Sequence, residues 1–275
     1  MTPRLAIVIV NYNGRGHLEG CLRSLADAPP HTSTEIIVVD NGSTDGSQAI
    51  VFAYPAVRLI EMRRNVGFSA GNNVGIRASA TELVLLLNND TIVPEGAIDR
   101  LVAALDADPQ AAVAGPRLVD AQGAAELSFG PMISPLGELR QKVLGRLHGR
   151  GFGPVTSWVE RSTRRAHYVD WVSGACLLVR RTVAERAGLL VVRFFLYTED
   201  VDFCASVRTQ GWKVLFTPSA EIVHLRGRSR STAPRESSAA YRRSHLAFYE
   251  KHHPRMLPFL KLYLRMKGEL PPERP

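Results

Sequence analysis

The sequence predicts a doubly wound α/β domain with a mainly parallel sheet, followed by a helical C-terminal appendage. Two observations carry this prediction: a strand-to-helix unit occurs four times in the first 110 residues, and each of the four strands ends in a polar or glycine-rich cluster. Repeated strand–helix units are typical of parallel sheets, because a helix returns the chain to the edge where the next strand starts. Ligands of such sheets bind outside the carboxyl ends of the strands, so we expect the four clusters to line one crevice.

The first unit begins with "LAIVIV", a β-branched apolar run that ends in the polar cluster Asn11 to Gly14. The segment 17–28 follows, and its apolar residues recur at the spacing of one helix face: Leu18, Cys21, Leu22 and Leu25. The unit is therefore predicted to be a buried strand, a loop and an amphipathic helix.

Three further units follow the same pattern. They are "TEIIVVD" with "NGSTDGSQAIVFAY", "VRLIEMRRN" with "VGFSAGNNVGIRASA", and "TELVLLLNND" with "PEGAIDRLVAALDAD". In the last unit the apolar run from Leu83 to Leu87 is typical of a strand buried on both faces, and it ends at Asn88, Asn89 and Asp90. A carboxylate at such a strand end either binds a ligand or serves as a helix cap or turn residue.

The second half of the chain is less regular. "VDWVSGACLLVRR" predicts a turn and then a buried strand, "LFTPSAEIVH" predicts another strand, and a helix is expected to begin near Glu199 with Asp202 as its cap. Residues 129–167 have poor periodicity apart from "LGELRQKVLGRL", and they predict a mobile loop or a helix that touches a membrane, with a disordered surface insertion as the alternative.

Residues 226–275 form the predicted appendage, a basic serine-rich linker followed by helical segments. Its last segment combines apolar and basic residues: Leu257, Phe259, Leu260, Leu262, Tyr263 and Leu264 beside Arg255, Lys261, Arg265 and Lys267. This composition suits a helix lying on an anionic membrane, and a helix packed on the domain is the alternative.

The composition is that of a globular protein of 275 residues with 45% hydrophobic residues, which can fill a sizeable core. The three cysteines include no C-x-x-C pair, so neither a disulfide framework nor a zinc site is indicated, and a reducing, cytosolic setting is expected. The apolar run that begins at Leu5 is too short for a signal peptide or a membrane span.

The formal net charge of +8 predicts an anionic partner, and nucleotide phosphates, nucleic acid and anionic lipids all qualify. The basic residues are concentrated in residues 140–151 and in the tail from Arg226, without interleaved stacking aromatics, so no nucleic-acid partner is expected. The G-x-G-x-x-G signature after the first strand and the G-x-x-x-x-G-K-[ST] signature are both absent, which argues against dinucleotide-binding and P-loop proteins.

Seven stretches occur in the order of a known family. They are "IVIVNYNG", "IIVVDNGSTDGS", "NVGFSAGNNVGI", "LLLNNDT", "VDWVSGACLLVRR", "FFLYTEDVDFC" and "GWKVLFTPSAEIVH". On these the chain resembles the inverting glycosyltransferases of family two, which have the GT-A fold, and within it the rhamnosyltransferase-like bacterial branch. The resemblance implies a GT-A domain over residues 1–225, in which residues 129–167 form the acceptor-side loop or helix.

The resemblance also implies a donor site. Asp40 would accept a hydrogen bond from the pyrimidine ring N–H of the nucleotide, and an acceptor-only carboxylate suits that edge. Asn11 and Asn13 would line the same pocket, while Arg64 and Asn65 would face the ribose or the phosphates. For the three asparagines a loop-capping role is the alternative.

Asn88 to Asp90 stand where the family keeps its D-x-D-like metal motif. Mg²⁺ and Mn²⁺ prefer oxygen ligands, so Asp90 is the predicted anchor and Asn89 a helper. His224 resembles the histidine that completes the metal site in several members, although a lone histidine after an apolar strand is often structural. Two acidic positions of the stricter motif are asparagine here, which leaves less negative charge for the ion.

On the acceptor side the resemblance places the catalytic base at Asp200, with Glu199 orienting the acceptor. Inversion at the anomeric carbon needs a carboxylate that takes the proton of the attacking hydroxyl. Asp170 and Trp171 would contact the acceptor sugar, although an aromatic beside a strand is often part of the core. The hydrophobic segment 190–192 departs from the polar turn of the family and puts the acceptor-side geometry in doubt.

The predicted function is transfer of a sugar, with rhamnose favoured, from a TDP- or UDP-sugar to a hydroxyl of a bacterial cell-surface polysaccharide or lipid-linked glycan. A divalent metal, Mn²⁺ or Mg²⁺, is the predicted cofactor. The location is predicted to be cytoplasmic, with peripheral contact at the inner face of the plasma membrane. The alternatives are a catalytically inactive nucleotide-sugar binding protein and a nucleotidyltransferase.

Overall fold

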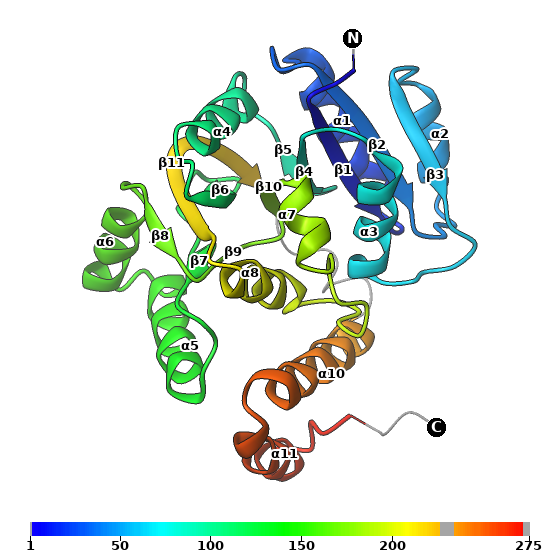
Figure 1. Ribbon diagram of the computed structural model, residues 1–275. Helices are drawn as coiled ribbons and strands as arrows, with labels where there is room; N and C mark the ends of the chain where they lie inside the picture. The colour runs from blue at the N-terminus through cyan, green and yellow to red at the C-terminus, as the bar shows by residue number, and fades with distance from the viewer. Residues whose placement is uncertain (1, 226–233, 272–275) are drawn as a thin grey trace.

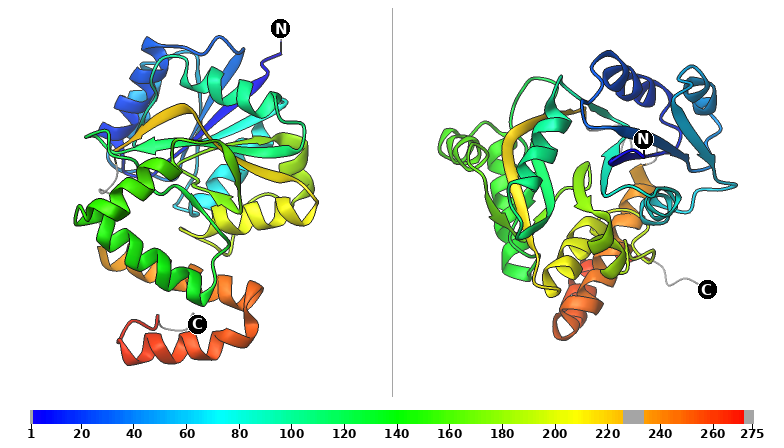
Figure 2. Two further views of the ribbon diagram at one scale, coloured as in Figure 1. Left: turned by 90° about the vertical axis from the view of Figure 1, so that its left-hand side faces the viewer. Right: turned by 45° about the horizontal axis from the view of Figure 1, so that its top comes forward.

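The structure of the chain is a computed structural model that describes residues 2–225 and 234–271 (Figure 1). Residues 226–233, most of the predicted basic linker, lie outside the described residues. Within the described part, the chain folds around one large sheet with helices on both faces, and further helices follow at the C-terminal end (Figures 1 and 2).

Nine described strands form the large sheet, in the order β3-β2-β1-β4-β10-β6-β11-β5, with β8 paired to β11. The strands are β1 (Leu5–Asn11), β2 (Thr34–Asp40), β3 (Val57–Glu61), β4 (Leu83–Asn88), β5 (Thr91–Ile92), β6 (Ala111–Val119), β8 (His167–Val169), β10 (Cys176–Arg180) and β11 (Lys213–His224). Strands β1 to β4 are parallel, β6 is parallel to β11, and β10 runs antiparallel between β4 and β6. The mainly parallel sheet predicted from the sequence is therefore confirmed, with β10 antiparallel in its interior and the short strands β5 and β8 antiparallel to β11.

Helices cover both faces of this sheet and extend beyond it. They are α1 (Arg15–Asp27), α2 (Ser47–Phe52), α3 (Phe68–Ala78), α4 (Ala97–Asp106), α5 (Pro135–Gly149), α6 (Gly153–Ser162), α7 (Arg181–Arg186), α8 (Glu199–Thr209), α10 (Pro234–His252), the short 3₁₀ helix η1 (Pro254–Met256) and α11 (Leu257–Met266). The four predicted strand–helix units are all present, because each of β1 to β4 leads into one of α1 to α4.

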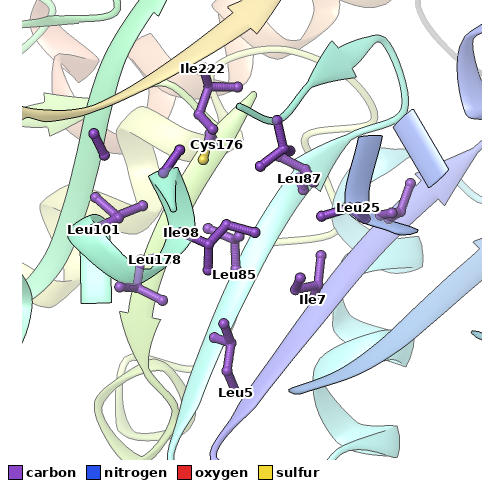
Figure 3. Packing of buried hydrophobic residues seen from close by; sticks show 14 of the residues in the cluster. Leu5, Ile7, Leu25, Leu85, Leu87, Ile98, Leu101, Cys176, Leu178 and Ile222 are labelled. Atoms are coloured by element: carbon purple, nitrogen blue, oxygen red, sulfur yellow. The ribbon is translucent and has the colours of Figure 1, made fainter. Parts of the chain in front are cut away.

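The core consists of two hydrophobic clusters, one on each face of the sheet. Leu5 and Ile7 of β1 face α1 and α4, whereas Ala6 and Val8 face α3 and α8. Figure 3 shows the first cluster, where Leu25 of α1 packs over the strands. Alternate residues of a strand point to opposite faces, so burial on both faces explains why the first strand is an unbroken apolar run.

Residues 129–167 contain two helices, α5 and α6, so the structure favours the helical alternative over a disordered insertion. Strand β7 (Phe129–Gly130), at the start of this segment, pairs with β9 (Trp171–Val172), which follows shortly after its end, in a separate two-stranded sheet. No helix within residues 2–225 and 234–271 is long and apolar enough to cross a membrane.

Helix α10 packs against the domain outside α8, on the side of the molecule away from α1 and α2 (Figures 1 and 2). Its Phe248 belongs to the same hydrophobic cluster as the residues of α8. Asp202 of α8 is fully buried, and its carboxylate lies 2.7 Å from Nζ of Lys251 and 2.6 Å from Nε2 of His252. The prediction that Asp202 caps α8 is therefore wrong: its side chain makes no cap and instead joins α8 to α10.

Candidate active site

The carboxyl ends of β1, β2 and β4 bring three predicted donor-site residues into one hydrogen-bonded chain. Asn11 and Asp40 are paired residues of the adjacent strands β1 and β2. Nδ2 of Asn11 donates to Oδ1 of Asp40 at 3.3 Å, and Nδ2 of Asn89 donates to Oδ1 of Asn11 at 2.6 Å. A Cβ at Gly14 would lie 2.2 Å from Nδ2 of Asn89, so a larger residue there would displace the amide that Asn89 donates to Asn11.

The carboxylate of Asp40 also organises the loop that follows β2. Its Oδ2 accepts hydrogen bonds from the backbone N–H of Ser43 at 3.0 Å and from Nε2 of Gln48 at 2.9 Å. With the bond from Asn11, three hydrogen bonds reach a carboxylate that can accept about four, so Oδ1 retains acceptor capacity. Asp40 is only 1% exposed, and its predicted contact with a nucleotide base stays a prediction.

Asn13 and Asn65 both make the loop contacts that were the alternative to ligand binding. Oδ1 of Asn13 accepts from the backbone N–H of Thr44 at 2.8 Å, across the loops after β1 and β2. Oδ1 of Asn65 accepts from Nδ2 of Asn41 and from the backbone N–H of Gly67, each at 2.9 Å. Arg64, the cationic member of the predicted donor set, is exposed at the same loop.

Asp90 and His224 meet where β5 pairs with the end of β11. Nε2 of His224 lies 3.4 Å from the Asp90 carboxylate, and Nδ1 lies 3.2 Å from the carboxylate of Glu126. Burial opposes a charge on this imidazole, but the hydrogen bonds to both carboxylates outweigh it and raise the pKa of His224 to about 9. Burial likewise opposes ionisation of Asp90, yet His224 and the nearby His17 lower its pKa overall.

Glu126 is not among the site residues predicted from the sequence. It belongs to none of the matching stretches, and 98 positions separate it from His224, so no local spacing connects the two. Its carboxylate holds Nδ1 of the imidazole and leaves Nε2 directed at Asp90. This is the arrangement in which a carboxylate orients a metal-binding histidine.

No group of three His, Cys, Asp and Glu side chains in the described part of the chain is arranged to hold a metal ion. The Asp90 carboxylate and, once an ion displaces its Nε2 proton, the imidazole of His224 nevertheless provide two neighbouring ligand groups of the types that Mn²⁺ accepts. Mg²⁺ and related ions at phosphate sites often take one or two protein ligands and complete their coordination with phosphate oxygens and water. The pair therefore fits an ion that binds together with a diphosphate.

Asp200 is held by the turn that precedes β10. Its Oδ2 accepts from the backbone N–H of Gly174 at 2.9 Å, and its Oδ1 accepts from the backbone N–H of Val201 at 2.8 Å. In the same turn, the carbonyl of Ala175 accepts a hydrogen bond from the backbone N–H of Asn88 at 2.9 Å. The predicted base is thereby tied to the end of β4, two residues from Asp90.

Glu199 and Asp200 have different surroundings although they are adjacent. Glu199 is 5% exposed, and its Oε2 has no hydrogen-bond partner among the described residues. Burial and then the charge of Asp200 raise the pKa of Glu199 well above its usual range. Burial also raises the pKa of Asp200, but the backbone N–H groups of Gly174 and Val201 oppose that effect. The pair is therefore biased towards a neutral Glu199 beside an ionised Asp200.

The hydrophobic segment that departs from the family pattern is docked on α3. Asn73 holds it with both ends of its amide: Nδ2 donates to the carbonyl of Leu190 at 2.7 Å, and Oδ1 accepts the N–H of Leu190 at 3.0 Å. Three non-glycine residues on either side of this segment have positive φ, namely Leu189 (62°) before it and Tyr197 (70°) and Thr198 (66°) after it. Such residues are rarely left-handed, so the surrounding contacts must maintain this path into Glu199.

Asp170 and Trp171 connect elements around α8. The Asp170 carboxylate lies 2.7 Å from Nη2 of Arg208 and accepts the backbone N–H of Met132 at 2.7 Å. Trp171 is 8% exposed, and its Nε1 donates to the carbonyl of Pro131 at 2.9 Å. Little of the indole is exposed, and the acceptor-binding roles of both residues stay predictions.

This sheet order, with polar residues at the ends of β1, β2 and β4, is the architecture of GT-A glycosyltransferases, and solved structures of that class match the chain. A mannosyltransferase from Pyrobaculum calidifontis in complex with GDP-Man and Mn²⁺ aligns with a TM-score of 0.61 and 18% identity, over 94% of this chain and 68% of its own. GalNAc-T7 with UDP, GalNAc and Mn²⁺ aligns with a TM-score of 0.60 and 16% identity, over 82% of this chain and 44% of its own. The fold predicted from the sequence is confirmed.

The chain belongs to glycosyl transferase family 2, whose model matches residues 6–166. It is 33% identical, over 265 residues, to the N-acetylglucosaminyl-diphospho-decaprenol L-rhamnosyltransferase of Mycobacterium tuberculosis. That alignment covers 92% of this chain and 86% of the relative. The resemblance to the rhamnosyltransferase-like branch is thereby confirmed, and the protein is a glycosyltransferase.

Proposed function

We propose that the protein is a metal-dependent, inverting glycosyltransferase that moves a sugar, rhamnose in the first instance, from a TDP- or UDP-sugar to a hydroxyl of a lipid-linked glycan. The observation that carries the proposal is the Asp200 carboxylate, which accepts the backbone N–H of Val201 in α8 and that of Gly174 in a turn that also binds the end of β4. The turn connects Asp200 to Asn88, two residues before Asp90, and the diphosphate would bind at the Asp90–His224 pair.

We assign binding of the sugar-nucleotide donor to residues at the carboxyl ends of the strands. Asp40 would accept the pyrimidine ring N–H, Asn11 and Asn13 would border the base, and Arg64 with Asn65 would face the ribose or phosphates. Asn89 already donates its amide to Asn11, so its contribution is to hold the pocket as well as to assist Asp90. The exposed guanidinium of Arg64 supplies positive charge for the phosphates.

A divalent ion held by Asp90 and His224 would stabilise the negative charge that develops on the leaving diphosphate. Asp200 takes the proton of the acceptor hydroxyl as that oxygen bonds to the anomeric carbon. The bond from the anomeric carbon to the diphosphate oxygen breaks on the opposite side, and the configuration inverts. Neutral Glu199 can donate a hydrogen bond to the acceptor while Asp200 remains the ionised base.

The acceptor class is proposed from the mycobacterial relative, whose name gives a decaprenyl-linked N-acetylglucosamine as its acceptor. We assign a polyprenyl-diphosphate-linked sugar, or a related cell-surface glycan, to this chain. A cytoplasmic location of the reaction belongs to the same proposal.

The test is a transfer assay with TDP-rhamnose, Mn²⁺ and polyprenyl-diphospho-N-acetylglucosamine. Release of TDP and formation of the disaccharide are followed, and NMR gives the anomeric configuration of the product. We expect inversion, and we expect Asp200→Asn to retain donor binding while turnover falls by about 10²–10⁴-fold. A retained configuration or near-normal turnover in this variant would refute the assignment. Nucleotide binding without any release, with every pyrimidine-diphosphate sugar tried, would favour the inactive binding protein.

A further inference from the structure

Helix α11 has apolar side chains on two opposite faces. One face packs against the domain through buried Leu264 and the partly buried Leu257 and Leu260. The other face carries large apolar residues that are exposed: Phe259 (65%), Leu262 (57%), Tyr263 (44%) and Met266 (80%). We call these four residues the α11 stripe, because their spacing of three and four positions puts them on one side of the helix.

The stripe lies within a segment that carries only positive charge. Residues 251–268 contain no Asp or Glu, and besides Lys251, which pairs with Asp202, their exposed basic residues are Arg255, Lys261, Arg265 and Lys267. A helix turns by about 100° per residue, which places Arg265 on one side of the stripe and Lys267 on the other, with Lys261 further round the helix beyond Arg265. Nζ of Lys267 also lies 4.9 Å from the ring centroid of Tyr263.

We propose that α11 binds the surface of an anionic lipid leaflet, with the stripe inserted between lipid chains and the basic residues on the headgroups. A short helix with an apolar face and a cationic border lies in the plane of a membrane surface and gains from both contacts. A second copy of the chain is a poorer occupant, because a twofold contact through the stripe would bring two identical cationic borders together.

Membrane binding by α11 would also bring a lipid-linked acceptor close to the protein. This step rests on the proposed function. Helix α11 follows α10, and α10 is joined to the acceptor-side helix α8 through the ion pairs of Asp202. Oγ of Ser244 on α10 also donates to the carbonyl of Leu196, in the segment that leads into Glu199. A leaflet bound by α11 would therefore deliver a lipid-linked acceptor to the same side of the protein as Asp200.

The test is vesicle flotation of the full chain without sugar nucleotide. Vesicles of phosphatidylcholine alone are compared with vesicles that also contain phosphatidylglycerol. We expect binding to the anionic vesicles that weakens with salt.

In the triple variant Phe259→Ser, Leu262→Ser, Met266→Ser, the partition coefficient should fall by about tenfold or more, because the apolar contact is lost. Lys261→Glu with Arg265→Glu should reduce binding to anionic vesicles only.

The matched control is Phe52→Ser, which removes an exposed aromatic residue (70%) at the end of α2, far from α11 in Figure 1. This variant should bind vesicles like the parent, and circular dichroism should show an unchanged fold in all variants. Equal binding of the parent and the triple variant would overturn the proposal, as would no binding of the parent. A parent that dimerises without vesicles and a monomeric triple variant would assign the stripe to a second copy and overturn it as well. Because no sugar nucleotide is present, these outcomes are independent of the transferase assay.

Discussion

Glu199 and Asp200 show how neighbouring carboxyl groups acquire different properties from their hydrogen bonds. Asp200 is placed against two backbone N–H groups, which stabilise its negative charge. Oε2 of Glu199 has no such partner among the described residues and is enclosed by the core side of α8. At the residue scale, the proposed division between a base, Asp200, and a neutral hydrogen-bond donor, Glu199, follows from which carboxyl group meets the turn at Gly174.

The raised pKa of Glu199 predicts a specific pH dependence of stability. Folded Glu199 keeps its proton at a pH where the unfolded chain, with a pKa of about 4.3, has lost it. The folded state then binds more protons than the unfolded state, so the free energy of unfolding falls as the pH rises above that value. We expect Glu199→Gln to lose this part of the slope in urea titrations between pH 4 and pH 8. Parallel curves for the parent and the variant would contradict the prediction, and Glu19→Gln, an exposed change on α1, is the control.

Glu126 is predicted to be a positioning residue for the proposed metal site. If its carboxylate orients the imidazole of His224, Glu126→Gln should weaken Mn²⁺ binding by about 10–100-fold. The measurement is Mn²⁺ electron paramagnetic resonance in the presence of UDP, which does not depend on turnover. Glu185→Gln, an exposed change on α7, should leave the affinity unchanged. An unaltered Mn²⁺ affinity in the Glu126 variant would restrict Glu126 to a structural role.

At the scale of elements, α8 is the helix that carries Glu199 and Asp200, and contacts from several other segments hold it in place. Its first turn is bound by the turn at Gly174 and, through Asp202, by α10, and its end is bound by Asp170 through Arg208. The segment that leads into α8 is held by the amide of Asn73 on α3. These contacts come from four different parts of the chain, and together they fix the direction in which Asp200 points.

Asn73→Ala is predicted to destabilise the protein by about 2–4 kcal/mol, because it leaves the backbone N–H and C=O of buried Leu190 without their partners. Asn72→Ala is the matched control, since the amide of Asn72 bonds only within α3, to the carbonyl of Phe68. Thermal unfolding should show a clearly larger loss for the Asn73 variant. Similar losses for both variants would mean that the segment is held mainly by its apolar contacts.

At the scale of the whole molecule, the proposed donor site spans two parts of the sheet. The base pocket lies at the ends of β1 and β2, and the Asp90–His224 pair lies at β5 and β11, near the opposite edge of the strand order. The link between them is the hydrogen bond from Asn89 to Asn11. A nucleotide diphosphate with its ion would connect the two parts directly.

We therefore predict that UDP and Mn²⁺ stabilise the protein cooperatively. A ligand at a concentration of 100 times its Kd stabilises the native state by about 2.7 kcal/mol, and UDP with Mn²⁺ should raise Tm by more than the sum of the two separate shifts. Asp90→Ala should abolish the contribution of Mn²⁺ alone, whereas Asp40→Ala should weaken the UDP shift with or without the ion. Additive shifts, or a Mn²⁺ effect that survives Asp90→Ala, would refute the shared site.

The sequence by itself determined the strand–helix units, the mainly parallel sheet and the family. The periods of two and 3.6 residues are local properties, and residues close in sequence report them without knowledge of the partner strand. The segment TEIIVVD therefore predicted β2 with its observed ends, and TELVLLLNND predicted β4 with ends that differ by two residues on each side. The polar residues after these strands marked the edge where the candidate site lies.

Only the tertiary structure decided which side chains meet across long separations. Glu126 reaches His224, Asn73 clamps Leu190, and Asp202 binds α10 in place of capping α8. The antiparallel insertion of β10 between β4 and β6 brings the turn at Gly174 to Asp200. Such contacts depend on strand order and helix packing, which arise from the burial of whole faces, and no local periodicity specifies them.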